Sequence, residues 1–186
     1  NNQKMRLLSL VLAAAIALGS VTAFADGEPV TPETTETTEI ASRETEGSWK
    51  DNTYTDAQGI TYQLNGNSIT VTGTSTNFSG GAITIPATIK KNGISYPVTG
   101  VGDRAFYNCD ALENVTFSGN ADSIGDYAFY SCDALESVTF SDDVGSIRGL
   151  AFYSCDALEN VTFSGNVGNI EGHAFWNCDS LENVTF

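Results

Sequence analysis

Four cysteines are the residues of this chain with the most obvious capacity for chemistry. They recur every 23 residues, and they are Cys109, Cys132, Cys155 and Cys178. A zinc site needs paired Cys or His at short spacing, and no Cys-x-x-Cys is present. Equal spacing would instead stack the sulfurs in one column, with adjacent Cα atoms about 5 Å apart, which a disulfide tolerates. Parallel side chains favour buried free thiols in the core, with rung-to-rung disulfides as the alternative.

Carboxylates recur with the same period in two further columns. They are Asp110, Asp133, Asp156 and Asp179, and Glu113, Glu136, Glu159 and Glu182. Stacked carboxylates could hold Ca²⁺, but the calcium-binding repeat Gly-Gly-x-Gly-x-Asp is absent. We therefore expect each Asp to accept hydrogen bonds from its own turn and each Glu to face solvent. The sequence predicts no metal and no cofactor.

Few residues of the chain fit a catalytic role. The single histidine, His173, has no fixed nucleophile beside it, so a Ser or Cys triad is not supported. The paired carboxylates repeat identically, whereas an active site is normally unique within its chain. No glycine-rich phosphate loop opens a helix. The sequence predicts that the protein is not an enzyme and has no catalytic residues.

The elements that must position these side chains are repeats that start at residues 101, 124, 147 and 170, the last one truncated. Each carries Leu-x-x-Val-x-Phe, and a period in the low twenties with this core is typical of leucine-rich repeats. In the first unit Leu112, Val115 and Phe117 point inward from one short strand. Ala128 and Phe129 pack from the far side in a short helical or 3₁₀ turn. The predicted fold is a β-rich leucine-rich-repeat solenoid with a parallel sheet and turns opposite.

Stacked coils bury one set of side chains and expose another. The predicted core ladder comprises Cys109, Cys132, Cys155, Cys178, Phe106, Phe129, Phe152, Phe175, Leu112, Leu135, Leu158 and Leu181. The candidate binding surface is the outward face of the strands and comprises Thr84, Asn114, Thr116, Ser137, Thr139, Asn160, Thr162, Asn183 and Thr185. This flat polar surface suits hydrogen bonding to a partner, and it is also what an exposed, well-paired strand looks like.

Two more columns are candidate contact surfaces. The aromatic column is Tyr107, Tyr130, Tyr153 and Trp176, for which half-buried packing is favoured over a carbohydrate platform. The fourth position of each repeat changes between coils, and its occupants are Arg104, Tyr127, Leu150 and His173. Constancy along the threonine column argues for a scaffold more than for specificity.

The chain before the repeats divides into three parts. Residues 1–25 carry Lys4 and Arg6, an apolar run and a small-residue end, which indicates a signal peptide. Residues 26–52 are rich in Thr and Glu and predict a disordered linker. Residues 53–100 contain Asn65-Gly66 and Asn92-Gly93, which predict two β-hairpins. These hairpins would cap the solenoid, and residues 82–86 would form its first rung.

The charge of the chain excludes two classes of partner. The net charge of −15 becomes −17 once Lys4 and Arg6 leave with the signal peptide. Between residues 101 and 186, Arg104 and Arg148 stand against fourteen Asp and Glu. Nucleic acid and anionic membrane demand clustered Lys and Arg. We expect no nucleic-acid partner and no membrane insertion after signal cleavage.

The pattern Ile-x-x-x-Ala-Phe-x-x-Cys-x-x-Leu-x-x-Val-x-Phe resembles the BspA-like leucine-rich repeats of bacterial surface proteins, over residues 59–186. The resemblance implies a secreted or cell-surface location and roles in adhesion or in protein or glycan binding. It brings no catalytic residues. The alternative is an accessory module of a longer secreted enzyme whose catalytic domain lies beyond residue 186. Because no closing half-coil follows the last strand, we expect a longer protein.

Overall fold

The structure is a computed structural model that describes residues 47–186. The chain divides into two units, Asn1–Ala41 and Ser42–Phe186. The predicted signal peptide and most of the predicted linker lie outside the described residues. Within residues 47–186 no helix has the length and apolarity needed to cross a bilayer.

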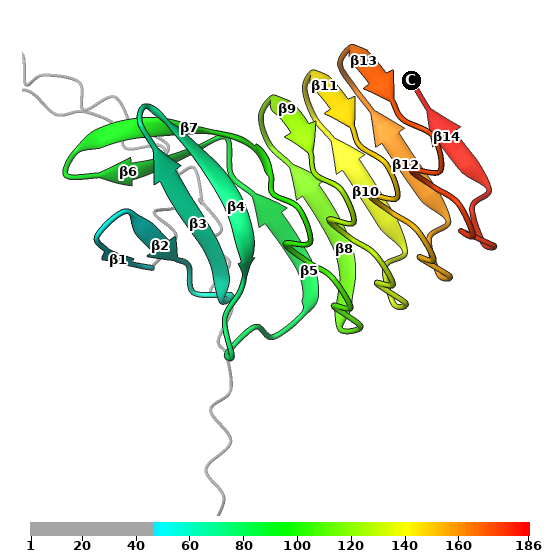
Figure 1. The fold of residues 1–186 in the computed structure, drawn as a ribbon, viewed down its shortest axis with the longest axis horizontal. Coiled ribbons are helices and arrows are strands. Elements are labelled where there is room, and N and C mark those ends of the chain that lie inside the picture. The colour runs from blue at the N-terminus through cyan, green and yellow to red at the C-terminus, as the bar shows by residue number, and fades with distance from the viewer. Residues whose placement is uncertain (1–46) are drawn as a thin grey trace, which may run out of the picture. The chain divides into compact units, whose positions relative to one another are not determined.

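Fourteen strands form two sheets along the stacked coils (Figure 1). The strands are β1 (Ser48–Lys50), β2 (Thr53–Thr55), β3 (Ile60–Asn65), β4 (Ser68–Thr74), β5 (Gly81–Ile85), β6 (Thr88–Lys91), β7 (Ile94–Val101), β8 (Leu112–Phe117), β9 (Ala121–Ile124), β10 (Ser137–Phe140), β11 (Val144–Ile147), β12 (Asn160–Phe163), β13 (Val167–Ile170) and β14 (Asn183–Thr185). The five-stranded repeat sheet has the order β14-β12-β10-β8-β5. The second sheet has the order β1-β2-β3-β4-β7-β9-β11-β13, with β6 paired to β7.

Each complete coil contributes one strand to each sheet, as β8 and β9, β10 and β11, and β12 and β13 do, in register with its neighbours. Strand β8 pairs with β10 in parallel, so that Val115 lies opposite Val138. The same 23-residue offset places Val138 opposite Val161 in the next pair. Leu112, Leu135 and Leu158 are completely buried. The prediction of a stacked leucine-rich-repeat solenoid is confirmed, with the correction that each coil has two strands and not one.

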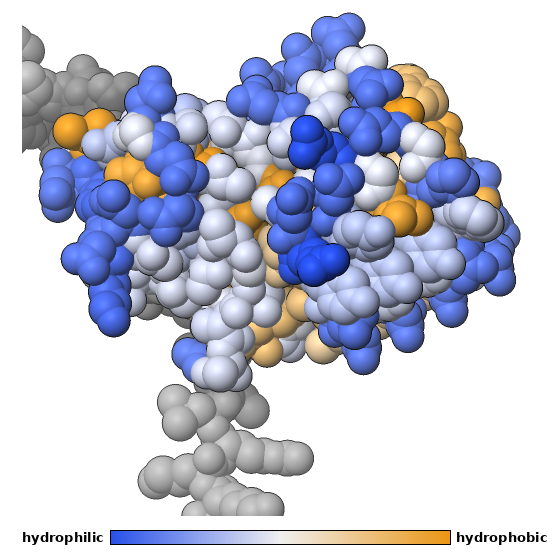
Figure 2. Space-filling view, in the orientation of Figure 1, coloured by the Kyte–Doolittle hydropathy of each residue, from blue (hydrophilic) through white to orange (hydrophobic). Residues whose placement is uncertain are grey.

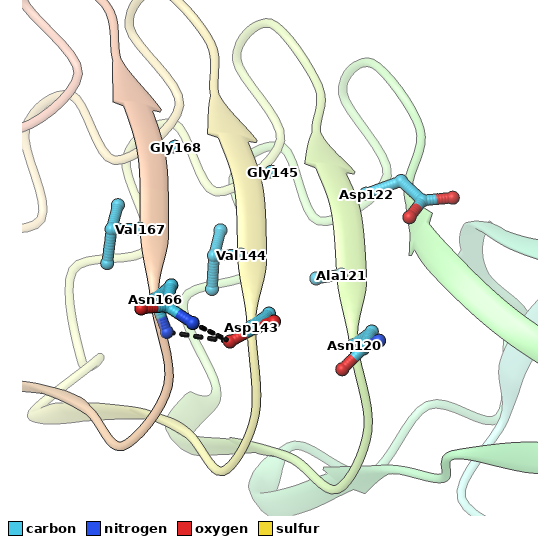
Figure 3. Close-up of a pocket in the computed structure, with 9 residues that line it drawn as sticks. All are labelled: Asn120, Ala121, Asp122, Asp143, Val144, Gly145, Asn166, Val167 and Gly168. Carbon is cyan, nitrogen blue, oxygen red and sulfur yellow. Dashed lines mark hydrogen bonds between the residues drawn. The ribbon is translucent and has the colours of Figure 1, made fainter.

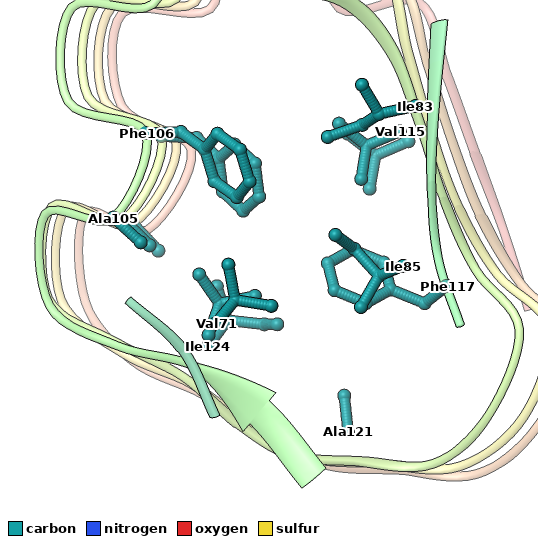
Figure 4. Packing of buried hydrophobic residues seen from close by; sticks show 14 of the residues in the cluster. Val71, Ile83, Ile85, Ala105, Phe106, Val115, Phe117, Ala121 and Ile124 are labelled. Atoms are coloured by element: carbon teal, nitrogen blue, oxygen red, sulfur yellow. The ribbon is translucent and has the colours of Figure 1, made fainter. Parts of the chain in front are cut away.

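Two columns of stacked phenylalanines fill the middle of the coils. Along the first column, the ring centroids of Phe106 and Phe129, and then of Phe129 and Phe152, are 4.9 Å apart. Along the second, Phe117 stacks on Phe140 at 4.6 Å. These distances match the spacing of paired strands. Figure 4 shows Phe106 and Phe117 entering the core from opposite sides of the coil, with Ile124 below Phe106.

The expectation of a helical or 3₁₀ turn opposite the repeat sheet is wrong, since residues 47–186 contain neither helix type. Between residues 102 and 109 the chain forms overlapping β-turns. Ala105 N donates to Gly102 O, and Tyr107 N donates to Arg104 O. The amides at alternate positions bond to the next coil instead, as Phe106 N does by donating to Ala128 O at 2.7 Å. A helix would keep all of these bonds within its own turn.

Residues 53–100 form the two hairpins that their Asn-Gly pairs predict. Strands β3 and β4 pair antiparallel, and so do β6 and β7. Strand β5 pairs in parallel with β8, so residues 81–85 are the first rung of the repeat sheet, as expected. Strand β4 joins the second sheet by pairing in parallel with β7. The role of the hairpins as a cap stays a prediction.

The predicted C-terminal boundary of the linker at residue 52 is wrong. Residues 48–50 form β1, which pairs antiparallel with β2. The indole of Trp49 lies against Tyr54, with ring centroids 5.2 Å apart, and its Nε1 donates to Lys90 O at 2.9 Å. A single large aromatic side chain therefore anchors the end of a Thr- and Glu-rich stretch on the second hairpin.

Candidate binding surface

The outer face of the repeat sheet carries the predicted threonine column. Strand register aligns Thr84 with Thr116, Thr116 with Thr139, and Thr139 with Thr162. Thr185 extends the column on β14. Side chains alternate along a strand, so the buried Val and Phe leave these threonines on the outer face.

The hydroxyls of this column are unpaired. Within residues 47–186, no side-chain hydrogen bond uses the hydroxyl of any of the five threonines. The neighbouring Asn and Ser column is bonded internally, because Ser137 Oγ donates to Asn114 Oδ1 and Asn183 Nδ2 donates to Asn160 Oδ1 at 2.9 Å. The predicted binding surface therefore offers free hydroxyls beside amides that are partly engaged.

The cysteine column lies between the aromatic column and the start of the repeat-sheet strands. All four cysteines are free; Cys132 and Cys155 are buried, while Cys109 and Cys178 are half-buried. Cys132 Sγ donates to Phe106 O of the preceding coil at 3.0 Å. Burial raises the pKa of the Cys132 thiol above 9.0. The pKa of the Cys155 thiol is raised mainly by a hydrogen bond with Cys178 and, as the second cause, by burial.

Three of the thiols thus donate to a phenylalanine carbonyl of the preceding coil, and Phe106 O also accepts from Cys109 N at 3.2 Å. Cys155 Sγ donates to Phe129 O at 3.1 Å, and Cys178 Sγ donates to Phe152 O at 3.0 Å. A protonated sulfur suits this position, because a thiolate has no hydrogen to donate.

The two carboxylate columns are exposed throughout. The expectation that each Asp of the first column accepts bonds from its own turn is wrong, because no such hydrogen bond occurs in the described part of the chain. Other carboxylates bind backbone amides of the next coil. Asp103 Oδ1 accepts from Asp126 N at 2.9 Å, and Asp143 Oδ1 accepts from Asn166 N at 2.7 Å. Across residues 47–186, no group of His, Cys, Asp or Glu is arranged to hold a metal ion.

Sequence reasoning missed a shallow hollow of about 350 Å³ beside β9, β11 and β13 (Figure 3). It is lined by Asn120, Ala121, Asp122, Asp143, Val144, Gly145, Asn166, Val167 and Gly168. Asp143 Oδ1 accepts from both the backbone N and the Nδ2 of Asn166. The signal that could have indicated it is Asp142-Asp143, which replaces the Gly-Asn of the coils on either side.

The aromatic column is a stack of parallel rings. The ring centroids of Tyr107 and Tyr130 are 4.8 Å apart at 5°, and those of Tyr130 and Tyr153 are 5.0 Å apart at 6°. Trp176 meets Tyr153 edge-on and is stacked with His173 at 4.4 Å. Tyr130 and Tyr153 are half-buried, whereas the end residues Tyr107 and Trp176 are exposed.

The coil at the β14 end exposes apolar side chains. Ile170, Val184 and Phe186 are among the exposed large hydrophobic residues, and hydrophobic atoms show at this end of the visible face in Figure 2. Phe175, Cys178 and Leu181 are half-buried here, whereas their counterparts in the two coils before are buried. The core ladder is thus complete in the middle coils and open at the last one.

Comparison with known proteins agrees with this architecture. Residues 82–186 match the family described as BspA type leucine-rich repeat region, in six copies. A leucine-rich repeat protein from Bacteroides capillosus ATCC 29799 is similar at 30% identity and a TM-score of 0.63, over 73% of this chain and 98% of that chain. No curated protein matches the chain.

Two further solved structures share the fold. A leucine-rich cell surface protein from Faecalibacterium prausnitzii A2-165 is 30% identical with a TM-score of 0.58, over 72% of this chain and 36% of that chain. A leucine-rich repeat protein from Bacteroides ovatus ATCC 8483 is 24% identical with a TM-score of 0.54, over 69% of this chain and 40% of that one, and shows the fold alone. By its repeat, its coil geometry and these matches, the chain belongs to the BspA-type leucine-rich repeat family.

Proposed function

We propose that this protein is a secreted or cell-surface binding module that attaches to a protein or glycan ligand, and that it is not an enzyme. The observation that carries the proposal is the row of unpaired threonine hydroxyls on the repeat sheet. Neighbouring hydroxyls lie one strand spacing apart, about 4.8 Å, so one extended polar ligand can bond several of them together.

The rigidity of the sheet favours such binding. Each strand is held by a neighbour on both sides, except at the ends of the sheet. A side chain that is already ordered loses little entropy when a ligand binds. The exposed Glu column, from Glu113 to Glu182, borders this face. Its charge disfavours anionic ligands.

The proposed location has two supports. Residues 1–25 have the order of a signal peptide, with Lys4 and Arg6 before the apolar run and Ala23-Phe24-Ala25 at its end. One similar protein is described as a cell surface protein. If the chain is exported, N-terminal sequencing of the secreted protein begins at Asp26, and retention of residues 1–25 contradicts export by this route.

The binding proposal is tested with the fluorescently labelled chain on arrays of glycans and of purified extracellular proteins. The variant Thr116→Val/Thr139→Val/Thr162→Val removes three hydroxyls and keeps β-branched side chains of similar shape. We expect at least tenfold weaker binding to the best ligand, with an unchanged melting temperature.

A matched control is Thr88→Val, which changes an exposed threonine on β6, a strand that is not part of the repeat sheet. It should bind as the wild type does. If the triple variant binds as tightly as the control, the threonine face is not the binding site. If neither array gives saturable binding, the module is a spacer.

A further inference from the structure

Every coil holds two non-glycine residues at positive φ, and the two positions use different kinds of residue. At the first position the residues are Arg104, Tyr127, Leu150 and His173, with φ of 58°, 57°, 58° and 64°. At the second position they are Asn108, Ser131, Ser154 and Asn177, with φ of 56°, 49°, 54° and 60°. The second set is small and polar; the first is large and differs in chemistry from coil to coil.

Stability of the fold does not account for the first set. Left-handed backbone is unfavourable for residues with a Cβ, and glycine or asparagine adopts it most readily. The first set does not supply the core either, because Arg104 and His173 are exposed and Tyr127 and Leu150 are half-buried. Bulky side chains kept at a strained position outside the core indicate a role in contact with another molecule.

These side chains join the aromatic column into one surface, the turn face, made of the first set together with Tyr107, Tyr130, Tyr153 and Trp176. The guanidinium carbon of Arg104 lies 5.4 Å from the ring centroid of Tyr127. The ring of Tyr127 lies 5.7 Å from that of Tyr130. His173 stacks on Trp176 at the other end. The turn face thus runs the length of the four coils.

The turn face offers ring edges and hydrogen-bond donors. The tyrosine rings cover one another's faces, since Tyr107, Tyr130 and Tyr153 stack in parallel. A sugar packs flat against a free ring face, so the inner tyrosines do not form a platform for carbohydrate. What points outward is the positively polarised ring edge. Within residues 47–186, no hydrogen bond uses the hydroxyls of these tyrosines or the indole N–H of Trp176.

Three of the carboxylates near this face already have partners. Asp103 Oδ1 accepts from Asp126 N, and Glu171 Oε2 accepts from Gly149 N at 3.1 Å. Asp126 Oδ2 lies 3.8 Å from Arg148 Nη1. These three acids therefore do not take up the donors of the turn face, which remain available to water or to a partner.

We propose that the turn face docks a protein partner whose contact surface combines apolar side chains with exposed backbone carbonyls. Tyr, Trp and Arg are the residues most enriched at energetically important positions of protein interfaces. This inference rests on the proposed binding function, and it assigns protein ligands to a face different from the threonine column.

The test uses a library of random peptides displayed on phage, selected on the wild-type chain after depletion on the variant Arg104→Gly/Tyr127→Gly/Leu150→Gly/His173→Gly. Because glycine adopts positive φ without strain, this variant removes the four side chains and keeps the backbone conformation of the turns. We expect its melting temperature to be unchanged or higher. The recovered peptides should be rich in apolar residues and should bind wild type at least tenfold more tightly than they bind the variant.

The triple threonine variant on the repeat sheet separates this inference from the proposed function. Peptides that dock on the turn face bind that variant as they bind wild type. If no peptide survives depletion, or if the survivors bind the glycine variant within twofold, the inference is overturned whatever the arrays show. Should the glycine variant fail to fold, the corresponding four asparagine substitutions serve, because asparagine tolerates the same backbone.

Discussion

Residues 48–100 and residues 101–186 contribute to the same two sheets by different means. In the repeats each contact is copied every 23 residues, so Val115, Val138 and Val161 make equivalent pairs. In the hairpin region the important contacts occur once, as with the bond from Tyr62 Oη to Asp56 Oδ2 at 3.0 Å. The energetic effect of a substitution in the repeats should therefore depend on how many coils flank it. In the hairpins it should depend on one specific partner.

The largest expected effect is in the middle of the repeats. Phe129 is completely buried between Phe106 and Phe152, so Phe129→Ala should lower the free energy of unfolding by about 3–5 kcal/mol. Phe175 occupies the same position in the last coil, where it is half-buried and stacks on Phe152 alone in this column. Phe175→Ala should cost about half as much or less. Urea denaturation measures both, and equal losses would contradict dependence on flanking coils.

The next effect belongs to the hairpin region. Asp56 is buried; its Oδ1 accepts from Gln58 N and Ile60 N, and its Oδ2 accepts from the Tyr62 hydroxyl. Asp56→Ala leaves three donors without a partner, and we expect a loss of about 2–3 kcal/mol. Tyr62→Phe removes one of these bonds together with its donor and should cost about 1 kcal/mol. A similar loss for both variants in urea denaturation would show that the amide bonds to Asp56 contribute little.

The third prediction separates the two regions by pH. Burial raises the pKa of Cys132 above 9.0. The pKa of Tyr62 is raised above 10.0, mainly by burial and secondly by the charge of Asp56. In each case the unfolded state loses its proton first, so folding stability is complete below the unfolded pKa and falls as the pH rises. The thiol should reduce stability from about pH 9, by at most about 1.4 kcal/mol per pH unit. The tyrosine should act only above about pH 10.

Urea denaturation between pH 8 and pH 10.5 measures this separation, with those limits set around the two unfolded pKa values. Cys132→Ala should reduce, without abolishing, the decline that begins near pH 9, because the pKa of Cys155 is also raised, and Tyr62→Phe should reduce only the part above pH 10. If Cys132→Ala leaves the profile between pH 9 and pH 10 unchanged, the buried thiol is not what makes folding sensitive to alkali there.

The sequence predicts the structure best where a local pattern is compatible with a single conformation. The 23-residue period gives the coil, the alternation in Leu-x-x-Val-x-Phe gives the strand, and Asn65-Gly66 and Asn92-Gly93 give the hairpin turns. The threonine column follows from the same alternation. The register then needs no further information, because identical coils bury their apolar side chains only when stacked in phase.

The two columns of the turn face are predicted from the sequence as candidate contact surfaces, but their backbone conformation is not. Arg104, Tyr127, Leu150 and His173 carry no sequence signal for positive φ, so the Ala-Phe pair of each coil predicts a helical or 3₁₀ turn that the structure does not have. The second strand of each coil was also missed, because segments such as Val144–Ile147 are short and contain glycine. The Thr- and Glu-rich composition predicts a linker up to residue 52, although Trp49 anchors β1 to the folded region. In each case a contact between neighbouring segments decides the structure.

The smallest expected effect tests whether the corrected boundary of the folded region matters. Lys91 Nζ lies 4.8 Å from the ring centroid of Trp49, donates to Asn52 Oδ1 at 2.8 Å and also donates to Asp51 O. Lys91→Met removes all three interactions at a solvent-accessible site, so the free energy of unfolding should fall by about 0.5–1 kcal/mol. Lys50→Met is the matched control, since Lys50 is exposed on β1, and should change it by less than about 0.5 kcal/mol. If Lys91→Met matches the control in urea denaturation, β1 is held by strand pairing and by the hydrogen bond from the Trp49 indole to Lys90 O. Lys91 would then not be one of the unique contacts that stabilise the hairpin region.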